Sequence, residues 1–190
     1  MLGCNMAPDL IVNAVAVPEN VIIRPTQESD ADAFRTLRLE ALRLHPEAFG
    51  ADLAESEARP IEHWQERTRP DPNGLQMTYI AVSDEALIGM AGIYRNRDFK
   101  GRQSSSIWGV YVREGWRGQH IAEGLVATCI KWAQAQADIR MVKLCVVTTN
   151  ISAIRCYIRC GFAMYGIEPE ALAWNGVYYD ELLMARRIVN

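Results

Sequence analysis

The chain has 190 residues, of which 49% are hydrophobic and 23% are charged, a composition typical of one globular domain. Its net charge of −3 at pH 7 and its pI near 5.7 argue against a general nucleic-acid or anionic-membrane surface. No apolar run approaches the ~20 residues that a membrane span requires. We therefore expect a cytoplasmic protein with no nucleic-acid or membrane partner.

Residues 1–19 contain no basic segment followed by a long apolar core and a small-residue cleavage site, so they do not resemble a signal peptide. We interpret them as an extension that need not be ordered, although "LIVNAVAV" could add an edge strand or contact a partner. The domain proper is expected at 20–190.

The cysteines and histidines show no metal-binding pattern. The five cysteines are Cys4, Cys129, Cys145, Cys156 and Cys160, and the three histidines are His45, His63 and His120. Cys156 and Cys160 stand four apart on an expected helix, but no second Cys or His pair follows at the spacing of a zinc site. We expect reduced thiols and no metal.

The first part of the domain alternates short elements. "VIIRP" (21–25) predicts a strand that ends at Pro25, and Ser29 or Asp30 is positioned to cap a helix over 31–44. The apolar face of this helix comprises Phe34, Leu37, Leu39, Ala41, Leu42 and Leu44. "HPEAFGA" then predicts a loop, and "IEHWQERT" after Pro60 predicts a second helix.

The remainder predicts a mixed sheet. Three strands in an antiparallel meander are followed by a helix, a strand, a helix and a hairpin that turns at Asn175-Gly176. The ranges are 76–83, 86–96, 104–112, 118–137, 141–148, 150–160 and 173–185. Antiparallel runs with one strand-helix-strand passage indicate an α+β fold with helices on the faces of the sheet.

Two segments carry functional signals. "REGWRGQHIAEGL" (113–125) places small residues at the turn from a strand into a helix, where unpaired backbone N–H groups and the positive end of the helix dipole favour an anion such as phosphate. An ordinary strand-to-helix loop is the alternative on this segment alone.

The second segment is "TNISAIRCYIRCGF" (149–162). Asn150 begins a helix whose apolar stripe is expected at Ile151, Ile154 and Ile158, with Tyr157 beside it and Arg155 and Arg159 on the solvated face. Gly161 is expected to end this helix in the left-handed conformation, and Phe162 to return to the core. By itself the pattern describes an amphipathic helix with a core tyrosine.

Together these segments resemble the motifs of the GNAT superfamily, which are N-acyltransferases that use acyl-CoA. The first motif is matched by Val110-Tyr111-Val112 followed by Arg117-Gly118-Gln119-His120-Ile121-Ala122, and the second by Asn150, Ala153, Tyr157, Gly161 and Phe162. The resemblance spans residues 21–188, and "HPEAFGA" with "YYDELLM" is similar to a bacterial branch of unassigned substrate. It implies a mixed, mostly antiparallel sheet of about seven strands, splayed between the fourth and fifth.

One position departs from the motif, because His120 stands where Gly is usual. We expect His120 to adopt helical backbone angles, so that its cost is side-chain crowding and not strain. We expect the ring to turn outward; donation of its N–H to a phosphate is the alternative.

The resemblance implies acetyl-CoA as co-substrate and the primary amine of a small molecule or peptide as acceptor. It implies that the backbone of Gly118 to Ala122, with Arg117, holds the pyrophosphate, and that the strand at Val110 to Val112 pairs with the pantetheine arm. Asn150 would lie beside the cofactor and Tyr157 would protonate the departing thiolate. A phenol with a pKa of about 10 is chemically able to do so.

The base and the acceptor are less defined. Candidate carboxylates are Glu40, Asp180 and Glu181, and Trp108, Trp174 and Tyr179 could wall the acceptor site. Each of these carboxylates could equally be solvated at the surface, and each of these aromatic residues could equally belong to the core. A non-catalytic acyl-CoA-binding or regulatory module on the same fold is the alternative function, and a homodimer is left open.

Overall fold

The computed structural model describes residues 16–189. Its strands are β1 (Ile22–Pro25), β2 (Gln76–Ser83), β3 (Ala86–Arg95), β4 (Ser104–Val112), β5 (Met141–Val147), β6 (Ala163–Trp174) and β7 (Val177–Arg187). Its helices are α1 (Ala31–Leu44), α2 (Leu53–Glu57), α3 (Ile61–Thr68), α4 (Ile121–Gln134) and α5 (Ile151–Arg159). Short 3₁₀ turns are η1 (Glu28–Asp30), η2 (Pro46–Ala48) and η3 (Glu114–Trp116).

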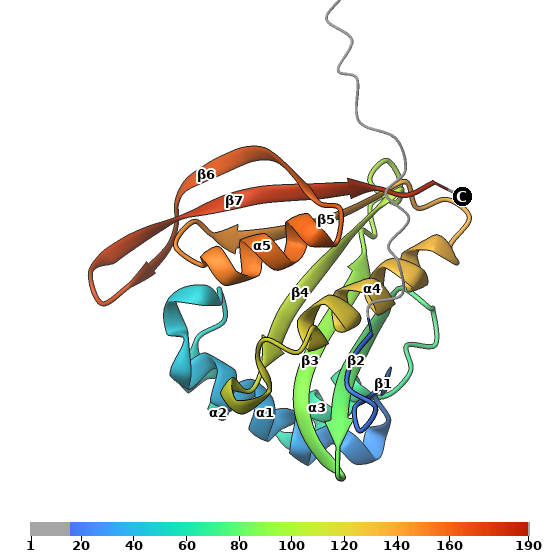
Figure 1. The fold of residues 1–190 in the computed structure, drawn as a ribbon, viewed down its shortest axis with the longest axis vertical. Coiled ribbons are helices and arrows are strands. Elements are labelled where there is room, and N and C mark those ends of the chain that lie inside the picture. The colour runs from blue at the N-terminus through green and yellow to red at the C-terminus, as the bar shows by residue number, and fades with distance from the viewer. Residues whose placement is uncertain (1–15, 190) are drawn as a thin grey trace, which may run out of the picture.

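The described strands form one seven-stranded sheet in the order β1-β2-β3-β4-β5-β7-β6. Strands β4 and β5 are parallel, and the other neighbouring pairs are antiparallel. The β4–β5 pairing covers only Ser104 to Ser106, opposite Met141 to Lys143. Beyond that point the two strands diverge, and Figure 1 shows the β5–β7–β6 part turning away from β4. This arrangement confirms the predicted α+β fold and its splay.

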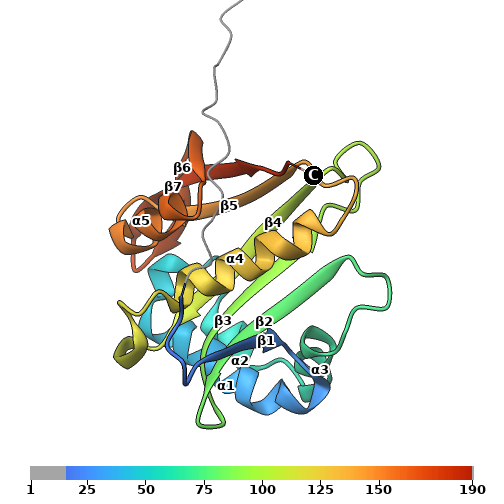
Figure 2. The same cartoon turned by 45° about the vertical axis from the view of Figure 1, so that its right-hand side comes forward.

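Helices cover both faces of the sheet. Figure 2 shows α4 lying across one face of β2, β3 and β4, with α1 and α3 on the other side. Two clusters of buried residues fill these layers: Leu125, Val126 and Cys129 of α4 belong to one, and Phe34 and Leu37 of α1 belong to the other. The sheet is therefore a rigid central layer, and its open edge at β4 is positioned by packing on both sides.

Most local predictions are confirmed. Helix 31–44, the three meander strands and the Asn175-Gly176 hairpin turn are present, although β6 extends much further back than the predicted hairpin. The helix at 53–57 was not predicted. Asp30 precedes α1, but its carboxylate accepts hydrogen bonds from the Gln27 N–H and from Arg24 and makes none to the helix.

The predicted apolar stripe of α5 is wrong at Ile151 and Ile158, although Ile154 packs against the core cluster as predicted. Ile151 and Ile158 are 52% and 56% exposed, whereas Cys156 and Tyr157 are buried. A nine-residue helix offers two candidate faces at helical spacing, and the smaller side chains of Cys156 and Cys160 allow that face to approach the sheet. Gly161, at φ +81°, and buried Phe162 confirm the predicted end of this helix.

The prediction that residues 1–19 form an extension lies mostly outside the described residues. No helix within residues 16–189 is both long and apolar enough to cross a membrane. In the same range no group of three or more His, Cys, Asp or Glu side chains could hold a metal ion.

Candidate active site

The splay opens a cavity of about 720 Å³ beside β4. Strand β4 also has a bulge along the edge that pairs with β3. The register of the two strands shifts there, between the Gly92–Trp108 and Met90–Tyr111 pairs. Gly109, within the bulge, has φ +66°, a conformation that favours glycine. The register with β3 skips Gly109 and Val110 and the pairing with β5 ends at Ser106, so Val110, which lines the cavity, has no strand partner on either side among residues 16–189.

The turn before α4 forms the second wall. Gly118 has φ +78°, and α4 begins at Ile121, so the N–H groups of His120, Ile121, Ala122 and Glu123 donate to no carbonyl within the helix, and that of Glu123 is bound by its own carboxylate. These donors and the positive end of the α4 dipole lie at the cavity, which makes this wall suited to an anion.

His120 does not adopt the helical angles predicted from the sequence. Its φ of +59° and ψ of 14° place it in the left-handed region, where a Cβ is disfavoured. The prediction of crowding without strain is therefore wrong, because the turn requires at this position the conformation that glycine supplies. The imidazole lines the cavity, with Nδ1 3.4 Å from Glu123 Oε1.

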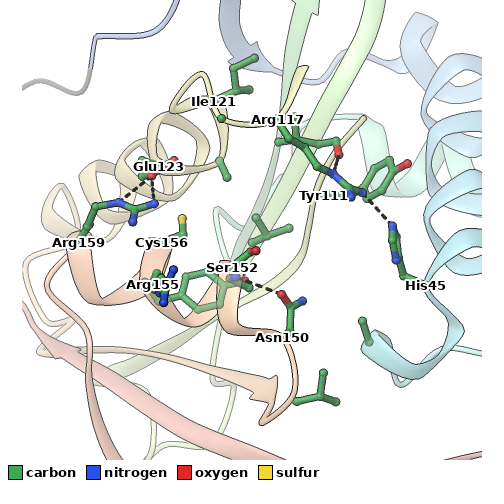
Figure 3. Close-up of a pocket in the computed structure, with 18 of the residues that line it drawn as sticks. His45, Tyr111, Arg117, Ile121, Glu123, Asn150, Ser152, Arg155, Cys156 and Arg159 are labelled. Carbon is green, nitrogen blue, oxygen red and sulfur yellow. Dashed lines mark hydrogen bonds and ion pairs between the residues drawn. The ribbon is translucent and has the colours of Figure 1, made fainter. Parts of the chain in front are cut away.

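Glu123, in the first turn of α4, is a buried carboxylate at the cavity wall. Arg159 of α5 donates to its Oε1 through Nε, at 3.0 Å, and through Nη2 (Figure 3). Burial favours the protonated form, but the hydrogen bonds and the charge of Arg159, the Glu123 backbone N–H and the His120 ring together outweigh it and hold the pKa of Glu123 below its usual range. The pair ties α5 to α4 across the cavity.

Arg117 connects the turn to two other elements. Its Nε donates to the carbonyl of Val112 at 3.0 Å, and its Nη2 lies 2.8 Å from His45 Nε2 (Figure 3). Because an arginine only donates, His45 Nε2 must accept in this contact and the imidazole carries its proton on Nδ1. The guanidinium also lies over the Tyr111 ring, 5.9 Å from its centroid.

Helix α5 supplies the third wall. Asn150 precedes it, and its Oδ1 accepts from the Ala153 N–H at 3.1 Å, which leaves the side-chain NH₂ without a partner among the described residues (Figure 3). Tyr157 lines the same cavity and is 7% exposed, with its ring against Phe162 at a centroid distance of 6.2 Å. None of the described residues bonds to its hydroxyl, and burial raises the pKa of Tyr157.

Most of the predicted cofactor and catalytic residues therefore meet at one cavity: Val110, Tyr111, Val112, Arg117, Gly118, His120, Ile121, Ala122, Asn150 and Tyr157. Within residues 16–189 the lining does not include Gln119, Glu40, Trp108, Asp180 or Glu181.

The other four candidates have neighbours of their own. Glu40 accepts from the Tyr111 hydroxyl at 2.9 Å and from Arg113, and Asp180 accepts from the Glu170 N–H. Glu181 pairs opposite Val147 on β5, and burial together with the charge of Glu168 raises its pKa. Trp108 packs on the α1 side of β4, where its ring lies flat against Gly92.

Sequence reasoning missed part of the lining. The segment after α1 contributes His45, Glu47, Ala48 and Phe49, and α5 contributes Ser152, Arg155, Cys156 and Arg159. The signal for Glu123 was a carboxylate on the otherwise apolar face of α4. The segment after α1 is "HPEAFGA", which is part of the family resemblance, but nothing in its residues indicates that it reaches the cavity, because only the fold brings it there.

The fold and this cavity define an α+β protein whose sheet opens around a ligand-sized site. A family model described as the Acetyltransferase (GNAT) family matches residues 35–162, which is more than half of the chain. The chain belongs to the GNAT family of acetyltransferases.

Similar proteins agree with this assignment. The chain is 26% identical over 167 residues to the L-amino acid N-acetyltransferase AaaT of Escherichia coli K12, covering 87% of this chain and 97% of the relative. Its fold matches Salmonella typhimurium YncA, solved with its cofactor acetyl-CoA, with a TM-score of 0.76, 18% identity and coverage of 90% and 96%. It also matches RimL, a ribosomal L7/L12 alpha-N-protein acetyltransferase solved with coenzyme A, with a TM-score of 0.73, 19% identity and coverage of 92% and 97%.

Proposed function

We propose that this protein transfers an acetyl group from acetyl-CoA to a primary amine of a small molecule or peptide by direct attack of the amine on the thioester. The observation that carries this proposal is the convergence of two sequence motifs and a strand bulge at one cavity. Similar proteins are named for amino acids and for a ribosomal protein amino terminus, so both kinds of acceptor occur among them.

The residues present fit acetyl-CoA. The free N–H groups at the start of α4 and the Arg117 guanidinium suit a pyrophosphate, and the volume of about 720 Å³ is within the usual range for a small-ligand site. The unpaired edge of β4 at Val110 and Val112 offers backbone groups to the amides of the pantetheine arm, and the Asn150 amide offers a further donor. When bound, acetyl-CoA supplies the thioester.

The bulge and Tyr157 supply the chemistry at the thioester. An N–H near Val110 would donate to the carbonyl oxygen as negative charge develops there. The Tyr157 hydroxyl would donate its proton to the departing sulfur. Burial raises the pKa of this phenol, which keeps it protonated before the reaction and opposes loss of its proton, whereas burial also disfavours a free thiolate in the same space, which favours transfer of the proton to sulfur.

The amine must lose a proton before or during attack, because a lysine-like amine has a pKa of about 10.4. Of the two carboxylates in the described lining, Glu123 is held by Arg159. This leaves Glu47 as the carboxylate open to accept the proton, directly or through water. Glu40, Asp180 and Glu181 would then serve structure more than proton transfer.

The test is release of free coenzyme A thiol from acetyl-CoA with a panel of primary amines, together with the melting temperature at millimolar acetyl-CoA. We expect thiol release that depends on the amine, and a higher melting temperature with the cofactor, because ligand binding to the folded state stabilises it. Binding without turnover for any amine would instead support the non-catalytic acyl-CoA-binding module. An unchanged melting temperature would contradict the cofactor site itself.

A further inference from the structure

One arginine beside the cavity has an incompletely satisfied guanidinium. Arg38 of α1 lies with its Cζ 4.8 Å from the centre of the Phe49 ring and 5.8 Å from that of Trp108. Its Nη1 is buried and has no hydrogen-bond partner among the described residues. The two rings fix the side chain without offering an acceptor, so the group is held in place with unused hydrogen-bonding capacity.

The charge of Arg38 is also uncompensated. No carboxylate within residues 16–189 forms an ion pair with Arg38 or with Arg67 of α3, which lies on Trp108 at 4.9 Å from the ring centre. Burial and the positive charge of Arg67 lower the pKa of Arg38 to about 10, so it remains cationic at neutral pH. Two cations therefore converge here with no anion from the described chain.

A neighbouring arginine on the same side of β4 shows the contrast. Arg113 is bound by both carboxylate oxygens of Glu40, at 3.0 and 3.1 Å from its Nε. The fold thus supplies a counter-ion from α1 for Arg113 and supplies none from the same helix for Arg38. Unpaired buried charge is costly, and a bound anion would remove that cost.

The position of Arg38 relates it to acyl transfer. A Cβ built on Gly109 would lie 3.4 Å from Arg38 Nη1, so the guanidinium lies directly over the β4 bulge. The next residue, Val110, lines the cavity, and so does Phe49, on which the guanidinium stacks. The cation is therefore next to the bulge at which the thioester carbonyl is proposed to bind.

We propose that Arg38 binds a carboxylate of the acceptor, which makes the acceptor class an amine with a nearby carboxylate, an α-amino acid. This inference rests on the proposed function. In an α-amino acid one carbon separates the amine from the carboxylate, so a carboxylate held over the bulge places the amine close to the carbonyl bound by the same bulge. Arg67 acts as a positioning residue that adds positive potential behind Trp108.

The experiment compares matched acceptors. Thiol release from acetyl-CoA is measured with the common L-amino acids, with their α-carboxamides, and with simple alkyl amines that lack a carboxylate. We expect one or more of the acids to be acetylated, and the matching amide to have a kcat/KM lower by at least about 10²-fold, because a site built for a carboxylate leaves its cation unpaired with the amide.

Variants assign the effect to one side chain. Arg38→Met should raise KM for the preferred acid by about 10- to 100-fold while leaving the KM for acetyl-CoA and the rate with the amide nearly unchanged. Arg38→Lys should recover part of the loss, since it keeps the charge but not the fork of donors. Arg43→Met, on the same helix and in an exposed ion pair with Glu57, is the control and should change neither KM.

The outcomes separate the two proposals. Acids and amides acetylated equally well by the wild type, or an Arg38→Met variant that folds and still prefers the acid to the amide as the wild type does, would overturn the carboxylate site and leave the acetyltransferase intact. If Arg38→Met does not fold, Arg38→Lys takes its place. An unchanged KM for the acid in Arg38→Lys would also overturn the carboxylate site. Acetyl-CoA binding without acetylation of any amine would overturn both.

Discussion

The two sides of the cavity are built from different parts of the chain. The side proposed to bind the cofactor, called the cofactor side below, consists largely of backbone: the β4 bulge, the left-handed turn at Gly118 and His120, and the first N–H groups of α4. The proposed acceptor side consists of side chains: His45, Glu47 and Phe49 line the cavity, and Arg38 of α1 lies outside the lining, against Phe49 and Trp108. Backbone donors serve any member of a family with the same cofactor, whereas side chains set what the individual member accepts.

The charges differ in the same way. On the proposed cofactor side two arginines have partners in the chain, because Arg159 is bound by Glu123 and Arg117 by His45 and the Val112 carbonyl, whereas Arg155 lines the cavity without an ion pair among the described residues. On the acceptor side Arg38 has no such partner among the described residues. Pairs within the chain therefore hold Arg117 and Arg159 in place on the cofactor side. On the proposed acceptor side, a negatively charged group of the substrate could pair with Arg38.

The largest expected effect concerns Tyr157, which lines the cavity and is proposed to protonate the departing sulfur. Tyr157→Phe keeps the ring against Phe162 and removes the proton. If the hydroxyl protonates the sulfur, kcat should fall by about 10²- to 10⁴-fold, with little change in acetyl-CoA affinity. Steady-state kinetics and calorimetric binding on one purified variant measure both.

Tyr79→Phe is the matched control, since Tyr79 is buried in the core outside the described cavity lining and burial raises its pKa to about 12. It should leave kcat unchanged. Wild-type turnover in Tyr157→Phe would remove the hydroxyl from the mechanism and leave protonation of the thiolate to water.

The sequence predicted the cofactor side better than the acceptor side for a physical reason. A left-handed turn, a helix start and a bulge each depend on a few adjacent residues, so Gly118, Asn150 and Gly161 carry local signals. The Arg38 cluster joins residues far apart in the chain, and nothing local to Arg38 shows that it lacks a counter-ion. The wrong stripe on α5 has the same origin, because only the packing decides which of two apolar faces is buried.

The next largest effect tests the internal pairing of the cofactor side. Glu123→Gln removes the charge that holds Arg159 and should lower the free energy of unfolding by about 2 kcal/mol at pH 7. Because the folded pKa of Glu123 is lowered, its contribution is present above the unfolded value of about 4.3 and is lost as the pH falls through the folded pKa. The difference from wild type should therefore shrink below about pH 4.

Urea unfolding at several pH values measures this difference. The exposed pair Arg43–Glu57 provides the control, since Glu57→Gln should cost less than about 1 kcal/mol. Acetyl-CoA affinity should stay equal or rise in Glu123→Gln, because a negative charge near the phosphate wall is removed. A loss of affinity would show that Glu123 positions a cofactor contact through Arg159.

A smaller effect separates the two roles of Asn150. Asn150→Ala removes the hydrogen bond to the Ala153 N–H and should cost about 1 kcal/mol of stability, whereas Asn150→Asp keeps that bond. Both variants remove the amide donor, so both should bind acetyl-CoA more weakly by calorimetry. Asp52→Ala, which removes the corresponding bond at the exposed start of α2, is the control and should lower stability alone. Full affinity in Asn150→Asp would contradict a cofactor contact by the amide.

The smallest expected effect tests whether the turn at His120 binds phosphate through its backbone N–H groups alone or also through the imidazole. His120→Ala keeps a Cβ at φ +59° and loses the ring, whereas His120→Gly removes the Cβ as well, so the glycine variant should be more stable than the alanine variant by up to about 1 kcal/mol. Asn175→Gly and Asn175→Ala, at φ 49° in the distant hairpin turn, should show the same ordering without any change in cofactor binding. If the turn binds phosphate only through backbone N–H groups, both His120 variants should hold acetyl-CoA as tightly as wild type or more so. An equal and large loss of affinity in both would instead show that the imidazole donates to a phosphate, and His120 would then belong to the side-chain part of the site.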